Sequence, residues 1–208
     1  MLGVINYGAG NFRSLCNALN FLKIPYSEIS KSEDFENVSH IILPGVGAFN
    51  DCIDRLESLG ITGRLKSEII NGKKFFLGIC VGHQILSSLG TEFEEKEGLN
   101  LIPGKTIKLE SSKNLPVPHI GWSEVNQVKK SGLFTDIEDG ATFYFVHSFY
   151  IDVKCDDDVL ASVSYGRNIT AAVAKNNIFG VQFHPEKSQT NGLQLLKNFS
   201  ELKDTDIS

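Results

Sequence analysis

The chain has 208 residues, of which 41% are hydrophobic and 22% charged, and its net charge is −5. This composition is ordinary for a globular protein, and no stretch has the make-up of a linker, so we expect one domain over residues 1–208. The negative balance and the scattered cations argue against nucleic-acid and membrane-surface partners, because both usually bind a basic patch.

The N-terminus and the cysteines indicate where the protein works. The opening MLGVINYGAG has no basic region and only a short apolar run, so it matches neither a signal peptide nor a membrane anchor. The four cysteines form no CxxC pair, which is typical of reduced thiols in a cytosolic protein. The five histidines are dispersed, without a familiar metal-ligand spacing. We therefore expect a cytoplasmic protein with no metal and no cofactor.

Strands and helices alternate in the first ninety residues. Hydrophobic periodicity predicts strands over 2–6, 24–29, 40–43 and 75–77, and helices over 12–22, 52–59 and 61–70. This alternation predicts an α/β fold with an open, mostly parallel sheet and helices on both faces. The YGAGN loop after the first strand lacks the third glycine of a dinucleotide-binding motif, because Arg13 stands in its place, so we assign no dinucleotide site.

The pattern changes after Gly90. Short β-rich runs separated by turn residues fill the chain from 101 to 183, which predicts mixed or antiparallel strands in the second half of the sheet. A last helix is predicted over 190–203, where Leu193, Leu196 and Phe199 form one apolar stripe.

The stretch KFFLGICVGHQIL, at 74–86, predicts a strand, a tight turn at Cys80 and a helix. Such an elbow exposes a nucleophile, and Gly78 and Gly82 let the two elements approach closely. The N-terminus of the helix favours a thiolate, and the amide of Val81 would point at an oxyanion. The alternative is a buried cysteine that only packs.

A thiol nucleophile needs a base, and His184 is the best placed histidine. It ends a predicted strand and is followed by Pro185 and Glu186, and residues i and i+2 of an extended segment project to the same side. The alternative is a surface histidine beside a solvated glutamate. We expect the triad Cys80, His184 and Glu186, acting as nucleophile, general acid and base, and orienting carboxylate.

Several motifs together resemble the triad-type (class I) glutamine amidotransferases, and within them the glutaminase subunits of imidazole glycerol phosphate synthases. The matching stretches run over nearly the whole chain: YGAGN at 7–11, LPGVGAF at 43–49, GICVGHQ at 78–84, HIGW at 119–122, YFVHSFY at 144–150 and QFHPEKS at 182–188. One position departs from the narrower family, since His83 stands where methionine is usual.

This resemblance implies an enzyme that hydrolyses L-glutamine to glutamate and ammonia through a cysteinyl thioester. It implies a second oxyanion donor at Val46 or Gly47, and glutamine contacts from Gln84 and from His147, Ser148 and Phe149. It also implies a heterodimer with a cyclase subunit of histidine biosynthesis, to which ammonia passes, and we expect Asn11 and Lys187 near that partner.

Three alternatives stay open at this point. A scaffold that kept the fold without activity is disfavoured by the intact triad residues, and a free-standing amidase by the lack of an acceptor-substrate domain. The strongest alternative is a related subunit that feeds ammonia to a sugar-amidinating synthase for surface polysaccharide. The sequence does not distinguish it from a glutaminase subunit of imidazole glycerol phosphate synthase.

Overall fold

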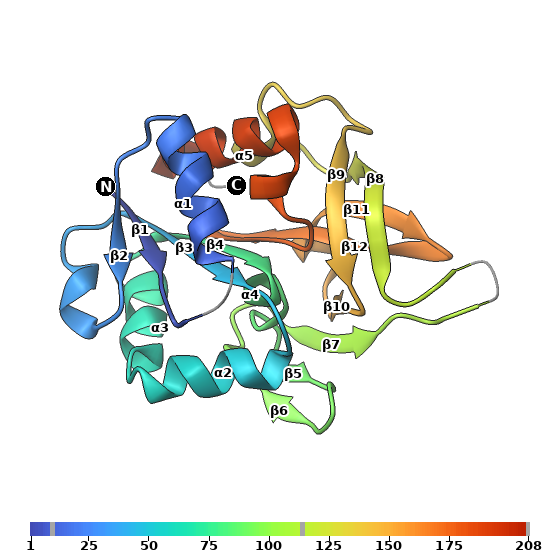
Figure 1. The fold of residues 1–208 in the computed structure, drawn as a ribbon, viewed down its shortest axis with the longest axis horizontal. Helices are drawn as coiled ribbons and strands as arrows, with labels where there is room; N and C mark the ends of the chain where they lie inside the picture. Colours follow the sequence, from blue (N-terminus) through green and yellow to red (C-terminus); the bar gives the residue numbers. More distant parts are fainter. Residues whose placement is uncertain (9–10, 113–114, 207–208) are drawn as a thin grey trace.

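The structure is a computed structural model that describes residues 1–8, 11–112 and 115–206. Ala9 and Gly10 of the YGAGN motif therefore lie outside the described residues. Within the described residues the chain forms a nine-stranded sheet and a four-stranded sheet (Figure 1). In sheet order the larger one consists of β2 (Tyr26–Ile29), β1 (Leu2–Ile5), β3 (His40–Gly45), β4 (Phe75–Cys80), β13 (Ile178–Val181), β12 (Arg167–Lys175), β11 (Val159–Tyr165), β8 (His119–Gln127) and β9 (Thr142–His147).

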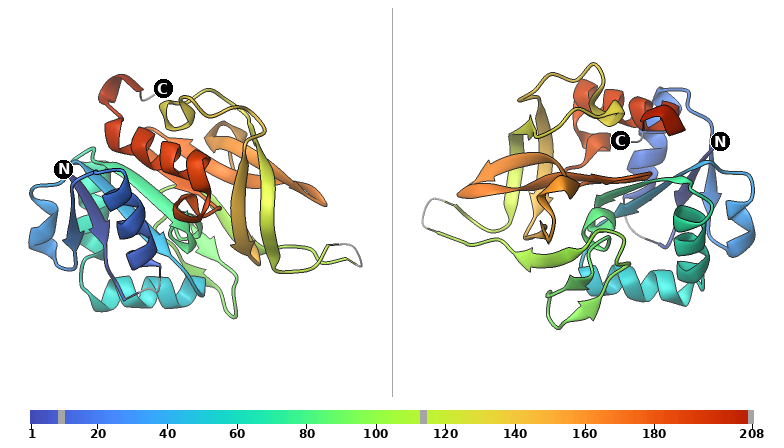
Figure 2. Two further views of the ribbon diagram at one scale, coloured as in Figure 1. Left: turned by 45° about the horizontal axis from the view of Figure 1, so that its top comes forward. Right: turned by 180° about the vertical axis from the view of Figure 1, so that it is seen from behind.

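The first half of the large sheet is parallel, as the alternation predicted. Strands β2, β1, β3, β4 and β13 pair in parallel, and β4 is buried along its whole length. Helices α1 (Phe12–Phe21) and α5 (Gln189–Glu201) cover one face, while α2 (Phe49–Ser58) and α3 (Thr62–Ile70) cover the other (Figures 1 and 2). Each helix buries one apolar stripe against the sheet, as Leu15 and Leu19 do in α1.

The second half of the large sheet is antiparallel, which confirms the mixed sheet predicted from the β-rich runs. Strands β12, β11, β8 and β9 pair in antiparallel fashion, and the β12–β13 pair joins the two halves. Because β13 pairs in parallel with β4, the carboxyl ends of these two strands lie side by side. The residues that follow both strands therefore meet at one edge of the sheet.

The second sheet is smaller and has four strands. It contains β10 (Phe149–Val153), β7 (Gly104–Lys108), β5 (Leu89–Gly90) and β6 (Lys96–Glu97), in that order. The β-rich run at 141–153 crosses from the large sheet to the small one at Ser148, between β9 and β10. Short 3₁₀ helices complete the described chain: η1 (Ser32–Phe35), η2 (Gly132–Phe134), η3 (Asp156–Asp158), η4 (Pro185–Lys187) and η5 (Asp204–Asp206).

The helix predicted after Cys80 forms but is short. It is α4 (Val81–Gln84), a single turn. The carbonyls of Ile85 and Leu86 accept hydrogen bonds from the amides of Leu99 and Ile102, at 2.7 and 3.0 Å, instead of continuing the helix. Hydrogen bonds to the segment after β6 thus replace further helical hydrogen bonds and end the helix. Hydrophobic periodicity does not predict such long-range pairing.

Candidate active site

Cys80 occupies a strained turn between β4 and α4. Its backbone has φ 54° and ψ −108°, a conformation that a residue other than glycine rarely adopts and that costs about 1–3 kcal/mol. The flanking glycines are required by close packing: a Cβ on Gly78 would lie 2.3 Å from the carbonyl oxygen of Gly82, and one on Gly82 would lie 2.1 Å from that of Leu43. The elbow thus fixes where the sulfur points, although Cys80 is only 3% exposed.

His184 follows β13 and meets Glu186 through a turn. The Nδ1 atom of His184 lies 2.8 Å from Oε1 of Glu186, and both side chains are fully buried. The contact that we predicted is present, but the backbone differs from the prediction: Pro185 begins the 3₁₀ helix η4 instead of extending the strand. Proline favours this first helical position, because its fixed φ suits a helix and its missing N–H is not needed there.

Asn11, just before α1, adds a donor to the pair. Its Nδ2 donates to Oε1 of Glu186 and lies 3.1 Å from Nδ1 of His184. Because a carboxylate oxygen only accepts, Nδ1 of His184 carries the proton in the His184–Glu186 bond. We expected Asn11 at a partner surface, but its side chain is 3% exposed and packs inside the chain. Its place indicates that it orients Glu186.

The protonation of His184 follows from its neighbours. Burial alone would lower the pKa of His184, but the negative charge of the Cys80 sulfur and the hydrogen bond and charge of Glu186 raise it to about 10. Nε2 of His184 is buried without an oxygen or nitrogen partner in the described chain. When the Cys80 sulfur carries its negative charge the ring is therefore an imidazolium, with the Nε2 proton available to the reacting atoms beside Cys80.

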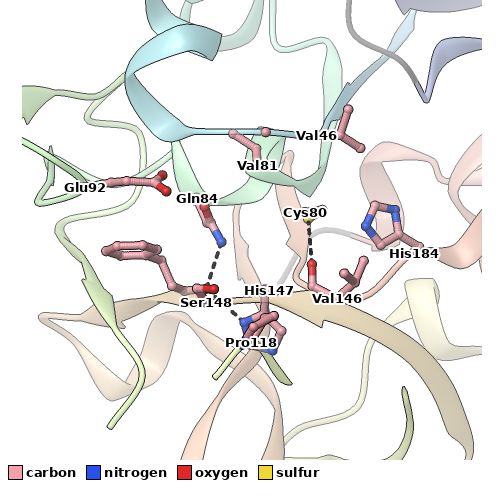
Figure 3. A pocket seen from close by; sticks show the side chains of 12 residues that line it. Val46, Cys80, Val81, Gln84, Glu92, Pro118, Val146, His147, Ser148 and His184 are labelled. Atoms are coloured by element: carbon pink, nitrogen blue, oxygen red, sulfur yellow. Dashed lines mark hydrogen bonds between the residues drawn. The ribbon is translucent and has the colours of Figure 1, made fainter. Parts of the chain in front are cut away.

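The candidate residues converge on one cavity of about 360 Å³ (Figure 3). It is lined by Val46, Gly47, Cys80, Val81, Gln84, Glu92, Pro118, Val146, His147, Ser148, Phe149 and His184. Most of these residues come from the β3–α2 loop, the elbow, the crossing between the two sheets and the segment after β13, while Glu92 lies between β5 and β6 and Pro118 just before β8. Glu186 lies behind His184, as expected of an orienting group. The cavity thus unites segments that are far apart in the sequence.

Two backbone segments flank the Cys80 sulfur. Val81 is the first residue of α4, so its N–H has no partner within that helix. On the other side, β3 pairs with β4 up to Gly45 opposite Cys80, which places Val46 and Gly47 beside the sulfur. Gly47 has φ +95°, and a Cβ built on it would meet nothing within 4 Å. This loop has room for its peptide to move.

The crossing at Ser148 is held from both sides. Gln84 Nε2 and His147 Nδ1 both donate to the carbonyl of Phe149, at 2.8 and 2.9 Å. His147 Nε2 then accepts from Nδ1 of His119 at 3.0 Å, because its own proton is already on Nδ1. Burial lowers the pKa of His147 to about 3, so the ring stays neutral. Both nitrogens of His147 are thus occupied within the chain, Nδ1 by the Phe149 carbonyl and Nε2 by the His119 ring.

Three cavity residues escaped the sequence analysis: Glu92, Pro118 and Val146. Glu92 accepts the amide of Phe49, the first residue of α2, at 2.8 Å, and this bond directs its carboxylate to the cavity wall. It stands in the acidic stretch EFEEKE, where no spacing distinguishes one glutamate from the next. Pro118 and Val146 line the cavity through the chain's path alone, for which the sequence has no signal.

His83 lies next to the site but outside the cavity. Its side chain is fully buried, and neither ring nitrogen has a hydrogen-bond partner in the described residues. Burial, with a smaller effect of His147, lowers the pKa of His83 to about 3. The ring is therefore neutral and packs as a core residue against Gly180, where a Cβ would lie 2.4 Å from Nδ1.

The described residues contain neither a metal-binding cluster nor a membrane-spanning helix. No three His, Cys, Asp or Glu side chains among residues 1–8, 11–112 and 115–206 are grouped so that they would hold a metal ion. None of the helices described there is long and apolar enough to cross a membrane.

Comparison with known proteins relates the chain to one enzyme family. The profile of the family "Glutamine amidotransferase class-I" matches residues 4–202. The imidazole glycerol phosphate synthase subunit HisH of Leptospira interrogans is 41% identical over 205 residues, covering 97% of this chain and all of that protein. HisH of Bacillus velezensis is 40% identical over 206 residues, covering 97% and 96% of the two chains.

Solved structures share the fold at lower identity. A structure of PurLQS from Thermotoga maritima superposes with a TM-score of 0.73 at 20% identity, covering 95% of this chain and 96% of that one. A structure described as a glutamine amidotransferase gives a TM-score of 0.75, also at 20% identity, with coverage of 96% and 97%. The α/β architecture is thus that of known amidotransferase structures.

Proposed function

Because the chain belongs to the class I glutamine amidotransferase family, and within it groups with the HisH subunits of imidazole glycerol phosphate synthase, we propose that it is the glutaminase subunit of such a synthase. It hydrolyses L-glutamine and delivers ammonia to a cyclase partner in histidine biosynthesis. One observation carries the chemistry: a cysteine on a strained elbow shares a cavity with a histidine ring that a buried glutamate orients.

The first half of the reaction forms a thioester. The Cys80 sulfur attacks the side-chain amide carbon of glutamine, so a C–S bond forms and negative charge develops on the amide oxygen. His184 then gives its Nε2 proton to the amide nitrogen, the C–N bond breaks and ammonia leaves. A γ-glutamyl thioester on Cys80 and a neutral imidazole remain.

The second half returns the enzyme to its starting state. Water attacks the thioester carbonyl while Nε2 of the neutral His184 accepts a water proton. The C–S bond breaks, the sulfur leaves as a thiolate and glutamate is released. Glu186 stays ionised throughout and holds the tautomer in which Nε2, not Nδ1, exchanges the proton.

The oxyanion of both steps needs donors, and two are within reach. The N–H group of Val81 has no partner within its helix. The N–H group of Gly47 belongs to the Val46–Gly47 peptide, which can rotate because Gly47 has no side chain. A peptide flip in this loop would add or remove one donor, and one such donor is worth roughly 10²–10³-fold in kcat. This is our explanation of how a partner could switch the site on.

Glutamine fits the remaining groups of the cavity. Its α-ammonium group pairs with the carboxylate of Glu92, the one acidic side chain among the lining residues of the cavity. The Gln84 NH₂ group is occupied by Phe149 and Gln182, so Gln84 offers its amide oxygen, and Ser148 its hydroxyl, to the rest of the glutamine substrate. His147 acts one step back, through the Phe149 carbonyl.

The partner binds a face next to this cavity. Ile120 and Trp122 are 60% and 47% exposed on β8, and they lie across from Val146 and Tyr144 of β9. The Lys187 ammonium lies 6.0 Å from the centre of the Tyr144 ring, on the same side. An exposed apolar face with a flanking cation suits a partner subunit, and Val146 connects it to the cavity.

The proposal is tested by measuring glutamate release from L-glutamine by the purified chain, alone and with the cyclase subunit of the same organism. We expect slow release by the chain alone and a marked increase in the complex, with no release by a Cys80→Ala complex. Glutamate release that persists in Cys80→Ala would refute the thioester mechanism. Full activity of the lone chain would refute the switch at the Val46–Gly47 loop.

A further inference from the structure

Gln182 is a buried polar residue that the reaction described above does not use. It lies between β13 and His184, and its side chain is fully buried. Its Nε2 atom lies 3.8 Å from the Sγ atom of Cys80, and its Oε1 atom lies 3.2 Å from Nε2 of Gln84. Gln182 thus connects the nucleophile with a residue of the cavity wall.

Hydrogen-bond accounting determines which way the Gln182 amide faces. The carbonyl of Phe149 can only accept, so the group of Gln84 that meets it at 2.8 Å must be the NH₂ group. The same NH₂ group meets Gln182, which must therefore present its oxygen to Gln84. It follows that the NH₂ group of Gln182 points at Cys80. The Phe149 carbonyl thus fixes the orientation of the Gln182 amide through Gln84.

We propose that Gln182 is a hydrogen-bond donor to the reacting sulfur, stabilising it as the thiolate and as the leaving group of the thioester. This inference rests on the proposed function, in which Cys80 is the nucleophile. A donor aimed at sulfur raises the thiolate fraction below the pH at which the thiol ionises freely, and it helps the C–S bond to break. The same hydrogen bond makes each thiolate a weaker nucleophile, but this loss is smaller than the gain in the number of thiolates. The reaction rate therefore rises.

The other groups around Cys80 leave this role open. Burial holds the pKa of Tyr7 far above its ordinary value and raises that of Cys52 to about 12, so both stay neutral. The carbonyl of Val146, with its oxygen 4.0 Å from Sγ, accepts from a thiol but offers nothing to a thiolate. His83 and His147 are neutral as well, each with a pKa of about 3. His184 and Gln182 thus present N–H groups to the anionic sulfur.

The experiment measures the alkylation of Cys80 by iodoacetamide, resolved from the other cysteines by peptide mass spectrometry. We would compare the full-length wild type with Gln182→Met, which keeps the size and removes the donor, at pH 6.5 and pH 9.5. We expect the alkylation rate of Gln182→Met to be roughly tenfold below that of the wild type at pH 6.5, which is the effect of losing one hydrogen bond to a charged group. At pH 9.5 the two rates should be nearly equal. Gln127→Met is the matched control, since Gln127 donates to the carbonyl of Ile137 away from the site and should leave both rates unchanged.

A second variant covers the case in which Gln182→Met does not fold. Gln182→Glu preserves the shape and replaces the donor by a carboxylate, so its rate at pH 6.5 should fall at least as far. In the complex, either variant should lower kcat for glutamine about tenfold with little change in KM, whereas a residue that merely supports Gln84 would raise KM. Wild-type alkylation rates at pH 6.5 in a folded variant would overturn the inference. Glutaminase activity independent of Cys80 would instead overturn the proposed function, so the two failures are distinct.

Discussion

The two nitrogens of the His184 ring have different partners, and this difference decides which proton the ring can move. Nδ1 is held by Glu186, whose oxygen also receives the Asn11 amide, while Nε2 is left for the reacting atoms. A single carboxylate thus sets both the orientation and the tautomer of the base.

Replacing Glu186 tests this arrangement. In Glu186→Gln the amide oxygen keeps both hydrogen bonds, because Asn11 and His184 donate to the same Oε1 atom, but the negative charge that stabilises the protonated His184 ring is lost. We expect kcat of the complex to fall roughly 10²-fold, less than the ~10⁴-fold of the analogous change in a serine triad, because a thiolate is the stronger nucleophile. The exposed Glu201→Gln on α5 serves as control. An unchanged kcat in Glu186→Gln would show that the reaction does not need the charge of Glu186.

His83 permits a prediction about stability. Both of its ring nitrogens are buried without partners, and an unsatisfied buried polar group costs about 1–3 kcal/mol. We therefore expect His83→Met to raise the free energy of unfolding by about 1–2 kcal/mol at pH 7, as measured by urea denaturation. His40→Met should have the opposite effect, because the His40 ring contacts the Ser39 hydroxyl and the Leu202 carbonyl, at 2.9 and 3.1 Å. A less stable His83→Met would contradict the assignment.

The same residue predicts a pH dependence. The pKa of His83 is about 3 in the folded chain, against an ordinary value of 6.5, so between these values the unfolded state binds more protons. Stability should therefore fall as the pH drops from 6.5 toward 3, and His147 contributes in the same direction. His83→Met should make this fall shallower, which denaturation curves at pH 7, 5 and 4 would reveal. An identical slope in both proteins would argue against a neutral buried His83.

Which site residues could be read from the sequence depends on whether local spacing carries their role. Cys80 between two glycines and His184 two positions before Glu186 carry such spacing. Gln182 and Glu92 do not, because their roles come from contacts with Cys80 and with the start of α2, far away in the chain. Asn11 was singled out by its motif, but only the fold shows that its side chain turns inward onto Glu186.

At the scale of elements, the β3–α2 loop tests whether backbone freedom serves the chemistry. Gly47 and Gly60 both have positive φ, +95° and +68°, and a Cβ would meet nothing within 4 Å at either. Changing either one to alanine should cost about 1 kcal/mol of stability through backbone strain alone. Only Gly47→Ala should also lower kcat of the complex, by roughly 10- to 100-fold, because it stiffens a peptide of the oxyanion loop. Equal kcat values in the two variants would remove the loop from the mechanism.

The elements themselves were predictable to the extent that they show a hydrophobic period. The parallel strands, the long helices and the β-rich second half follow from such patterns, and the structure confirms them. The two-residue strands β5 and β6 have no period to detect. The run at 141–153 reads as one strand, although it crosses between sheets at Ser148, because the crossing depends on which neighbours each half finds. That crossing supplies the wall of the cavity.

At the scale of the whole molecule, the proposed partner face makes a prediction about assembly. Trp122 and Lys187 both approach Tyr144, since the centre of the Trp122 ring and the Lys187 ammonium lie 5.9 and 6.0 Å from the centre of its ring. We expect Trp122→Ala to weaken binding of the cyclase subunit at least tenfold, since exposed tryptophans are frequent anchors of interfaces, with a smaller effect of Lys187→Ala. Phe21→Ala, which removes an exposed aromatic side chain on α1, is the control. Calorimetric titration would measure both, and wild-type affinity in Trp122→Ala would exclude this face.

The central claim is that Cys80 supplies ammonia to chemistry performed by another subunit. The most direct measurement compares product formation by the wild-type and Cys80→Ala complexes with the cyclase subunit, given the acceptor substrate and either L-glutamine or ammonium as the nitrogen source. We predict that Cys80→Ala abolishes glutamine-dependent synthesis and keeps ammonium-dependent synthesis at the wild-type rate. Glutamine-dependent synthesis by the Cys80→Ala complex would contradict the account.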